Sequence, residues 1–441
     1  MAATTSSPSS VAPGAPGLRV AAPDSRGSKR LRVLVVTKLF PSGASPTFAV
    51  YNGLQMAALA RVCDVDVRAT VPWFPGARIL KRWSPAGQFA ELPARETVHG
   101  LDVRHPRFLA LPRVGRIAAP ALYAASLWPG LRGLAGKVDV VLGCWAFPDG
   151  LAAILLARHL GAAVAVKVHG SDLNVLPQDA TLRRLLEEGL PKVDRLIAVS
   201  RPLGQRAIEL GVPADRVEVV SNGIDREIFK PADRTEARRA LGLPLDGPLI
   251  AYVGRLDRAK GLHELLDAFR TLAQRHPALR LAIVGDGPEL GKCQQAAAEA
   301  WVGGRLFLPG ALPMPQVAAW IAACDVLTLP SWNEGTPNVL MEAFACGRRV
   351  VATSVGGIPD VVSSPELGEL VPVRDVPALT AALERVAFTP YVAETLTRAA
   401  PYGWPESGAR LRDVLQAAVD HHRAQTTGAV HPAGAARVRS P

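Results

Sequence analysis

Short apolar runs rich in β-branched residues alternate with amphipathic or Ala/Leu-rich stretches along most of the chain. Such runs, bounded by turn residues, are typical of strands buried in a parallel sheet, and the stretches between them are long enough for helices. In the first half we expect helices near 47–60 and 149–160. The expected strands are 31–37, 138–142, 164–168, 196–200 and 217–220. This βαβ succession predicts a doubly wound parallel sheet in an α/β protein.

A second succession of the same kind begins after the sequence Ser-Asn-Gly-Ile-Asp at 221–225. Its expected strands are 249–253, 280–284, 305–308, 326–329 and 348–352. We therefore expect two Rossmann-like domains, 30–225 and 226–404, facing each other across a cleft. A final helix at 405–425 either completes the second domain or returns to pack on the first.

Both ends of the chain are expected to be disordered tails. Residues 1–29 are mainly Ala, Ser, Pro and Gly, and residues 426–441 are similar. The first tail lacks the apolar core of a signal peptide. The longest uncharged run of the first domain, 117–131, is too short to span a bilayer and contains two prolines. These features predict a protein without a membrane span.

The cysteines indicate a reducing compartment. The chain has five, an odd number, and none is in C-x-x-C spacing. This pattern predicts neither a disulfide framework nor a zinc site, and it favours a cytoplasmic location. With 441 residues, of which 49% are hydrophobic, the chain is long enough for two domains with separate cores.

The positive charge lies in the first half of the chain. Residues 1–200 hold 24 Lys and Arg against 13 Asp and Glu, whereas residues 201–441 hold 26 of each. The basic segments 78–83 and 104–116 interleave cations with Leu, Phe, Trp or Pro. Such a surface suits anionic lipid headgroups on the inner face of a membrane, and a solvated basic face is the alternative. No nucleic-acid-binding module accompanies the charge, so no nucleic acid partner is expected.

Polar motifs follow several of the predicted strands. Parallel sheets bind ligands beyond the carboxyl ends of their strands, so two facing sheets would place such motifs on the two walls of one cleft. The motifs lie at 41–47, 169–172, 254–260, 285–289 and 334–342. Their convergence is stronger evidence for a ligand site than any one of them.

The segment from Glu334 to Glu342 is the most informative of these motifs. Thr336 is a candidate N-cap and Pro337 suits the first helical position, so a helix amino end with free N–H groups is expected there. Asn338 and Glu342 would share one face of that helix. N–H groups for a phosphate and a carboxylate for hydroxyls suit a sugar nucleotide. The alternative is an ordinary capped helix with surface acids.

Two cations stand five positions apart at another strand end. Arg255 follows the turn residue Gly254, and Lys260 opens the next helix. Together they could hold a pyrophosphate and meet the negative charge that grows as a glycosyl–phosphate bond breaks. This arrangement could replace a divalent metal. The His and acidic residues show no metal-ligand spacing, so no bound metal is expected. A surface Arg and a helix-starting Lys are the alternative.

Two further strand ends carry candidate site residues. His169 ends an apolar strand, where its ring would point into the cleft, with Asp172 close behind. A strand also precedes the Gly-rich turn at Gly285, which would let a ligand approach the backbone closely. That turn is not G-x-G-x-x-G, and the chain has no G-x-x-x-x-G-K-[ST], so neither a nicotinamide enzyme nor a P-loop NTPase is expected.

Taken together, the motifs resemble the retaining GT-B glycosyltransferases of family 4, of the bacterial exopolysaccharide and cell-envelope type. The resemblance covers roughly residues 30–425. The matching segments are Val-Gly-Arg-Leu-x-x-x-Lys-Gly at 253–261, Val-Gly-Asp-Gly-Pro-Glu at 284–289, Glu-Gly-x-Pro-Asn at 334–338, Glu-Ala-x-Ala-x-Gly at 342–347, Gly-Gly-Ile-Pro-Asp at 356–360, Phe-Pro-Asp-Gly at 147–150 and His-Gly-Ser-Asp at 169–172.

The resemblance implies roles for five side chains. Arg255 and Lys260 would bind the donor diphosphate, and Glu342 would bind the ribose hydroxyls. Glu334 would contact hydroxyls of the transferred sugar, and His169 would lie beside the reacting sugar. His169, Arg255, Lys260 and Glu334 are thus the candidate catalytic residues, with no covalent role assigned to Glu334. Members of this family act without a bound metal and retain the anomeric configuration, for which front-face attack assisted by the departing phosphate is the usual proposal.

The resemblance also implies backbone contacts to the donor. The region 310–312 would hold the base, and 335–338 the phosphate and sugar. The expected donor-binding positions are Gly254, Gly285, Gly310, Leu312, Gly335, Thr336, Pro337, Asn338 and Glu342. Many relatives carry a Gly-Gly pair in the first loop, whereas this chain has the single Gly43. Gly43 and Asp172 are the candidate acceptor-side residues.

These inferences predict a cytoplasmic, membrane-peripheral glycosyltransferase. It would move a hexose-type sugar from a UDP- or GDP-sugar to a hydroxyl of a cell-envelope or exopolysaccharide glycan carried on a lipid. One alternative is a GT-B enzyme with a small soluble acceptor. Another is a non-catalytic subunit of a polysaccharide assembly complex, although that role predicts loss of the donor-site charges, which are all present. An epimerase fits the motifs less well.

Overall fold

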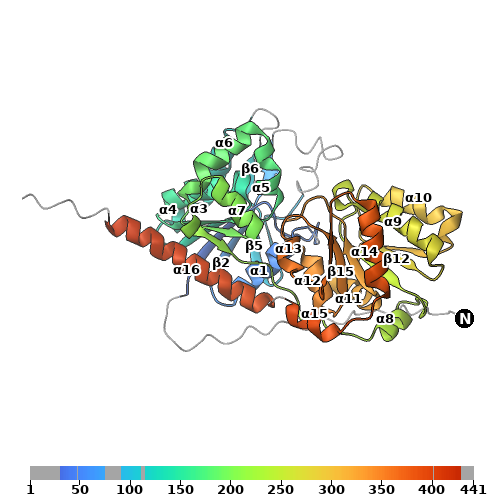
Figure 1. Ribbon diagram of the computed structural model, residues 1–441. Helices are drawn as coiled ribbons and strands as arrows, with labels where there is room; N and C mark the ends of the chain where they lie inside the picture. Colours follow the sequence, from blue (N-terminus) through green and yellow to red (C-terminus); the bar gives the residue numbers. More distant parts are fainter. Residues whose placement is uncertain (1–29, 47, 75–90, 111–114, 401, 429–441) are drawn as a thin grey trace, which may run out of the picture.

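The computed structural model describes residues 30–46, 48–74, 91–110, 115–400 and 402–428. The tail expected at 1–29 and most of that at 426–441 lie outside these residues, as do the basic segment 78–83 and part of 104–116. Figure 1 shows two α/β domains side by side, each built on its own sheet. The predicted fold class, two Rossmann-like parallel-sheet domains, is confirmed.

The first sheet has eight strands in the order β10-β9-β8-β7-β1-β2-β5-β4. All neighbours in it are parallel except the hairpin of β4 and β5. The strands are β1 (Arg32–Thr37), β2 (Asp64–Ala69), β4 (Arg95–Val98), β5 (Leu101–Arg104), β7 (Val140–Cys144), β8 (Ala163–Val168), β9 (Arg195–Ala198) and β10 (Val217–Val219). A separate parallel pair joins β3 (Val71–Trp73) to β6 (Arg107–Leu109).

The second sheet has six parallel strands in the order β13-β12-β11-β14-β15-β16. They are β11 (Leu249–Val253), β12 (Arg280–Val284), β13 (Leu306–Gly310), β14 (Val326–Leu329), β15 (Arg349–Thr353) and β16 (Gly368–Val371). The order reverses between β11 and β14, which is where open parallel sheets bind ligands.

Helices cover both faces of each sheet. In the first domain they are α1 (Val50–Ala60), α3 (Ala119–Leu131), α4 (Leu151–Leu160), α5 (Ser171–Asn174), α6 (Ala180–Gly189) and α7 (Arg201–Glu209). Those that follow are α8 (Arg234–Ala240), α9 (Leu262–Arg275), α10 (Leu290–Ala298), α11 (Met314–Ala323), α12 (Asn338–Ala345), α13 (Ile358–Val361), α14 (Val376–Phe388), α15 (Ala393–Ala399) and α16 (Trp404–Gly428). Within the described residues, no helix is both long and apolar enough to cross a bilayer.

Alternating side chains of the central strands supply two cores in the first domain. Val33 and Val35 of β1 pack with residues of α1 and α16, whereas Leu34 and Val36 pack on the opposite face with residues of α3 and α4. The period of two along a strand explains the split. A third cluster fills the second domain.

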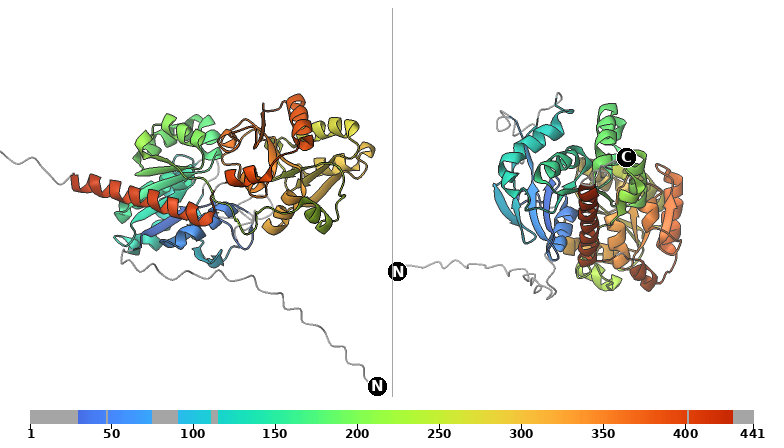
Figure 2. Two further views of the ribbon diagram at one scale, coloured as in Figure 1. Left: turned by 60° about the horizontal axis from the view of Figure 1, so that its bottom comes forward. Right: turned by 90° about the vertical axis from the view of Figure 1, so that its left-hand side faces the viewer.

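Helix α16 returns from the second domain to the first. It runs along the first sheet against α1, β8 and β9 (Figures 1 and 2). Its residues Leu411, Leu415 and Ala418 are fully buried there. Burial of this apolar face holds the helix on the first domain.

Two chain segments connect the domains, and we call them together the interdomain crossing: residues 220–225 and 402–404. Ile224 pairs with Gly403 in a parallel bridge. A Cβ on Gly223 would lie 2.6 Å from the Trp404 nitrogen, so glycine is required for this close approach. The crossing therefore holds the start of α16 against residues 223–224.

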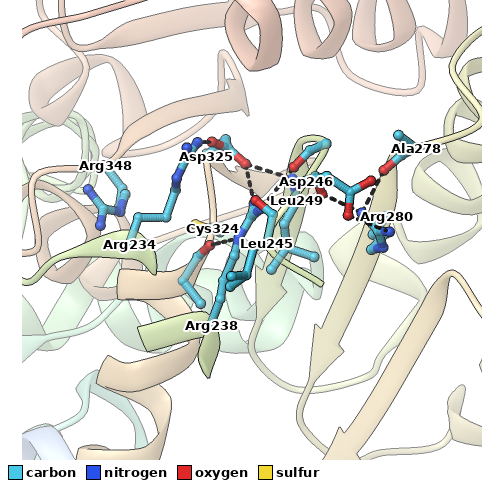
Figure 3. Close-up of polar contacts among 12 residues, drawn as sticks. Arg234, Arg238, Leu245, Asp246, Leu249, Ala278, Arg280, Cys324, Asp325 and Arg348 are labelled. Atoms are coloured by element: carbon cyan, nitrogen blue, oxygen red, sulfur yellow. Dashed lines mark hydrogen bonds and ion pairs between the residues drawn. The ribbon is translucent and has the colours of Figure 1, made fainter. Parts of the chain in front are cut away.

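Asp325 and two arginines of α8, the buried Arg238 and the partly exposed Arg234, form a polar cluster in the second domain (Figure 3). Asp325, which precedes β14, accepts hydrogen bonds from the Leu249 N–H (2.7 Å) and from Arg238 (2.6 Å), and it also pairs with Arg234. Arg238 is 1% exposed and donates to three backbone carbonyls as well. This cluster fixes α8 to the sheet, and its donors are used by the protein itself.

Candidate active site

Lys260 and Glu334 meet in front of the second sheet. The Lys260 Nζ donates to the Glu334 Oε1 at 2.5 Å, and the Ser331 hydroxyl donates to the same oxygen at 2.8 Å. The Trp332 N–H binds the Ala259 carbonyl at 2.8 Å, which ties the loop after β14 to the loop after β11. The Glu334 side chain is only 11% exposed, and Lys260 supplies its counter-charge.

Arg255 does not join this pair in the structure. Its side chain is 70% exposed and lies 3.6 Å from Asp257. Without an anion between them, two cations repel, so the extended position of Arg255 is physically reasonable. Lys260 is thus neutralised by Glu334, while Arg255 points to solvent.

The start of α12 differs from the prediction. The Thr336 hydroxyl donates to the Val199 carbonyl of the first domain (2.9 Å), so the prediction that it caps α12 is wrong. Pro337 occupies the N-cap position, and Asn338 is the first helical residue. The Asn338 N–H bonds to the Thr336 carbonyl at 3.0 Å, so this N–H group is not free for an anion.

The side chains of α12 that face the cleft are held by the first domain and the crossing. The Tyr51 hydroxyl of α1 donates to the Glu342 Oε1 at 3.0 Å, and the Asn222 Nδ2 donates to the Asn338 Oδ1 at 3.0 Å. Glu342 is 4% exposed, and burial raises its pKa to about 7 although the Tyr51 hydrogen bond opposes this shift. Asn338 and Glu342 share a face of α12, as expected.

Glycines let the two domains touch backbone to backbone. A Cβ on Gly335 would lie 1.8 Å from the His169 carbonyl oxygen of the first domain. Within the second domain, a Cβ on Gly356 would lie 1.8 Å from the Glu334 carbonyl oxygen, so Gly356 holds the Glu334 loop in place. Gly170 has a φ of 142° and packs its Cα side against Gly335. The loop after β8 and the loop before α12 therefore form one seam between the domains.

His169 lies at this seam, and the Asp172 side chain holds the turn that carries it. The Asp172 carboxylate is fully buried and accepts hydrogen bonds from the N–H groups of His169, Gly170 and Ala146. Asp172 therefore shapes the turn after β8 and does not face the cleft, unlike the expectation that it would serve the acceptor. Burial holds the pKa of His169 well below its usual range, so the ring is neutral at pH 7.

His169 also lines a cavity of about 230 Å³ between the domains. Its Nε2 is buried and has no hydrogen-bond partner in the described part of the chain, and its ring stacks on Trp145 at 6.2 Å. The cavity lining consists of Leu39, Ala49, Tyr51, Asn52, His169, Val199, Asn222, Thr336 and Asn338. Among the described residues that line it, none carries a formal charge at pH 7.

The other expected donor-side glycines lie at the ends of neighbouring strands. The Gly285 N–H donates to the Gly310 carbonyl at 2.9 Å, and a Cβ on Gly285 would lie 1.9 Å from the Gly254 carbonyl oxygen. The three residues thus bring the ends of β11, β12 and β13 together. Leu312 follows β13 and packs half-buried on the core of this domain.

Gly43 lies away from the cavity lining. Its N–H donates to the Glu96 carboxylate at 2.9 Å, and Glu96 also contacts the His105 ring at 2.7 Å. The first-loop region contributes Leu39 and the start of α1 to the cavity instead. Sequence reasoning missed Tyr51 and Asn222, although Asn222 follows a strand end as the other site residues do.

Within the described ranges, no group of three or more His, Cys, Asp or Glu side chains is arranged to bind a metal ion. The one Asp-x-Asp at 64–66 lies at the start of β2, where Asp64 pairs with Arg30 and Asp66 pairs with Arg68. Both acids form ion pairs at the start of β2, the end of the strand that lies away from the seam.

Two parallel-sheet domains whose loops meet in a seam of glycines, with a Lys–Glu pair at the seam and the start of α12 at the interdomain cavity, define a GT-B glycosyltransferase. Residues 233–401 match the model for glycosyl transferases group 1, and residues 83–228 match that for glycosyltransferase family 4. The D-inositol 3-phosphate glycosyltransferase of Frankia alni is 31% identical over 403 residues, covering 85% of this chain and 94% of that protein. The chain belongs to the family 4 glycosyltransferases.

Other relatives agree with this assignment. The putative teichuronic acid biosynthesis glycosyltransferase TuaC of Bacillus subtilis is 28% identical over 410 residues, covering 90% of this chain and 98% of that protein. Anabaena HepE in complex with UDP has the same fold, with a TM-score of 0.61 at 20% identity over 91% of this chain and the whole of that chain. The predictions of a glycosyltransferase and of the GT-B fold are confirmed.

Proposed function

We propose that this enzyme transfers a hexose-type sugar from a UDP- or GDP-sugar to a hydroxyl of a cell-envelope or exopolysaccharide glycan carried on a lipid. Transfer would retain the anomeric configuration and would need no bound metal. The observation that carries the proposal is the Lys260–Glu334 pair in the loops before α12, next to Gly335 at the seam between the domains. Structural neighbours solved with UDP and UDP-glucose support a nucleotide-sugar donor.

The donor diphosphate would rearrange this pair. Its phosphate oxygens compete with Glu334 for Lys260 and attract Arg255, which is free to swing because it is 70% exposed. Both cations then meet the charge that develops on the leaving group, which lowers the barrier more than it strengthens ground-state binding. Glu334, released from Lys260, can accept hydrogen bonds from hydroxyls of the transferred sugar.

The seam would place the reacting sugar beside His169. The ring is neutral and its Nε2 lacks a partner in the described chain, so it can donate to or accept from one sugar or acceptor hydroxyl. In front-face attack the departing phosphate takes the acceptor proton, so no side chain needs to act as a nucleophile. Closure of the seam excludes water and limits hydrolysis of the donor.

Glu342 would bind the ribose hydroxyls. Its Oε1 is occupied by the Tyr51 hydroxyl in the structure, so a ribose must share or replace that contact. The carboxylate form is the better acceptor for two hydroxyls, and the raised pKa of about 7 makes this form depend on pH. Donor affinity should therefore increase between pH 6 and 8.

A small soluble acceptor is the second candidate. It is favoured by the names of several relatives, which are D-inositol 3-phosphate glycosyltransferases. The cations at the seam, Lys260 and Arg255, are assigned to the donor diphosphate, and the described cavity lining adds no cation for the phosphate of a phosphorylated acceptor. We therefore favour a glycan hydroxyl. Screening of lipid-free acceptors, inositol phosphates included, separates the two candidates.

The lipid-linked acceptor also motivates a cytoplasmic location on the inner face of a membrane. The positive charge of the chain is concentrated in residues 1–200. Ile117 and Trp73 of the first domain are 71% and 40% exposed, and cations beside exposed apolar side chains suit anionic lipid. The second domain would then hold the donor while the first rests on the membrane.

Nucleotide binding and transfer test the proposal. UDP, GDP and ADP are compared by thermal shift, since a ligand at 100 times its Kd adds about 2.7 kcal/mol of stability. The preferred nucleotide sugar is then assayed for transfer to lipid-linked glycan in excess chelator, with the product anomer read by NMR. Activity lost in chelator and restored by a divalent metal would contradict metal independence, and an inverted product would contradict retention.

A further inference from the structure

Lys167 is a buried cation that the proposed chemistry does not use. It lies on β8 and is fully buried, on the face of the first sheet that packs against α1 and α16. In the described part of the chain, no carboxylate forms an ion pair with it. Burying an ammonium is unfavourable even though the Asp172 charge acts on it at longer range, and the neighbouring residues on the same face of β8, Ala163 and Ala165, are small and apolar.

Two neutral amides accept from this ammonium. The Lys167 Nζ donates to the Gln55 Oε1 of α1 and to the Asn222 Oδ1 of the interdomain crossing, the latter at 3.3 Å. Burial lowers the pKa of Lys167 to about 8, so the charged form still dominates at pH 7. An ammonium can only donate, so both amides must turn their oxygen toward it.

This constraint passes from Asn222 to α12. Because the Asn222 oxygen faces Lys167, its Nδ2 faces outward and donates to the Asn338 Oδ1 at 3.0 Å. The Asn338 oxygen is thereby engaged by Asn222, and its Nδ2 is the end left available to a ligand. Among the described residues, none accepts a hydrogen bond from the Asn338 Nδ2, and Asn338 lines the cavity.

We propose that Lys167 is a positioning residue that acts through Asn222 to make Asn338 present N–H groups, rather than its carbonyl oxygen, to a phosphate oxygen of the donor. The inference rests on the proposed donor site at α12. It explains why a buried charge is kept in the first domain although Lys167 itself does not line the cavity. It also compensates for the Asn338 backbone N–H, which is used by Thr336.

The hydrogen-bond relay from Lys167 through Asn222 to Asn338 spans both domains. Lys167 belongs to the first sheet, Asn222 to the crossing and Asn338 to the second domain. The correct orientation of Asn338 is therefore imposed only when α12 lies against the crossing. Donor binding and domain closure would then favour each other, because each needs the same hydrogen bond between Asn222 and Asn338.

A second branch from the same ammonium supplies a control. The Gln55 Nε2 donates to the Ser407 hydroxyl at 2.8 Å, and that hydroxyl donates to the Ser221 carbonyl at 3.1 Å. This branch ties α1 and α16 to the crossing but does not reach α12. Ser407→Ala should cost stability without changing which end of Asn338 faces the cavity.

The deciding variant is Asn222→Asp in the full chain. Its carboxylate keeps the contact with Lys167 but can only accept, so Asn338 must turn its NH2 toward it and its oxygen toward the phosphate. We expect the Kd for UDP and for GDP, measured by calorimetry, to rise at least about tenfold, which corresponds to about 1.4 kcal/mol. Lys167→Met should weaken binding similarly. The KM for the donor should rise while the KM for the acceptor stays unchanged.

The outcomes separate the inference from the proposed function. Nucleotide binding by Asn222→Asp as tight as that of the parent overturns the relay, as does an equal loss of binding in Ser407→Ala. If Lys167→Met does not fold, Asn222→Asp decides alone, because it adds an ion pair and removes no atom from the core. A parent chain that binds neither UDP nor GDP contradicts the proposed donor site itself.

Discussion

Replacing Lys260 by Met tests the donor site most sharply. The Lys260 Nζ lies 2.5 Å from the Glu334 Oε1, and the Lys260 side chain is 28% exposed. Removing one preorganised donor to a developing negative charge costs about 10²–10³ in turnover, or about 2.7–4 kcal/mol. We therefore expect kcat to fall by that factor in a transfer assay at saturating donor.

The same substitution should also affect folding, and the two effects can be separated. Without Lys260, the Glu334 carboxylate keeps only the Ser331 hydroxyl as a side-chain partner, and a buried unsatisfied group costs about 1–3 kcal/mol. Adding Glu334→Gln removes the unpaired charge and should restore most of the stability. The double variant should remain as slow as Lys260→Met.

Lys292→Met is the matched control, because Lys292 is exposed on α10 in the same domain. It should leave both turnover and the free energy of unfolding near those of the parent. The reasoning is refuted if Lys260→Met transfers sugar at more than about a third of the parent rate while its fold is intact. It is also refuted if turnover recovers together with stability in the double variant.

Three further predictions follow from the pKa of Glu342, the seam and the basic first domain. Burial raises the pKa of Glu342 in the folded state from 4.5 to about 7, so its contribution to stability is present below pH 4.5 and is lost as the pH rises to 7. Glu342→Gln should remove up to about 3 kcal/mol of this pH dependence of the free energy of unfolding, measured with denaturant. A pH dependence that the substitution leaves unchanged would contradict the burial argument. Gly335→Ala places a methyl group 1.8 Å from the His169 carbonyl oxygen and should abolish transfer. The control Gly291→Ala, whose methyl group meets no atom within 4 Å, should keep the parent activity. Equal activity of the two variants would show that the seam need not close. Sedimentation with anionic vesicles should be strong at low salt and weak at about 0.5 M salt, and absence of binding at low salt would defeat the membrane proposal.

Buried strands were the part of the fold that the sequence pattern could predict. The runs that became β1, β7, β8, β11, β12 and β14 are continuous and apolar because both faces of these strands are covered. Strands β2, β4 and β5 carry charged residues at exposed or half-exposed positions near the sheet edge, so their composition resembles that of a loop. Strand β16 is short and begins with a glycine, which hides it in the same way.

The sequence could predict only those site residues that belong to a local motif. Lys260, Glu334 and the cleft-facing residues of α12 follow strand ends in the second domain, and local spacing shows them. Tyr51 lies 291 positions from Glu342, and no local pattern links the two. The predicted cap at Thr336 is wrong because the Thr336 hydroxyl donates to the Val199 carbonyl of the first domain. This partner depends on how the two domains pack together.

A crystal structure of the enzyme with UDP or GDP would test the central claim most directly. The account predicts the diphosphate in the seam, with an oxygen at about 2.7–3.2 Å from the Lys260 Nζ and another within hydrogen-bonding distance of the Asn338 Nδ2. The guanidinium of Arg255 should have turned toward it. A nucleotide bound elsewhere, with Lys260 still paired to Glu334, would contradict the account.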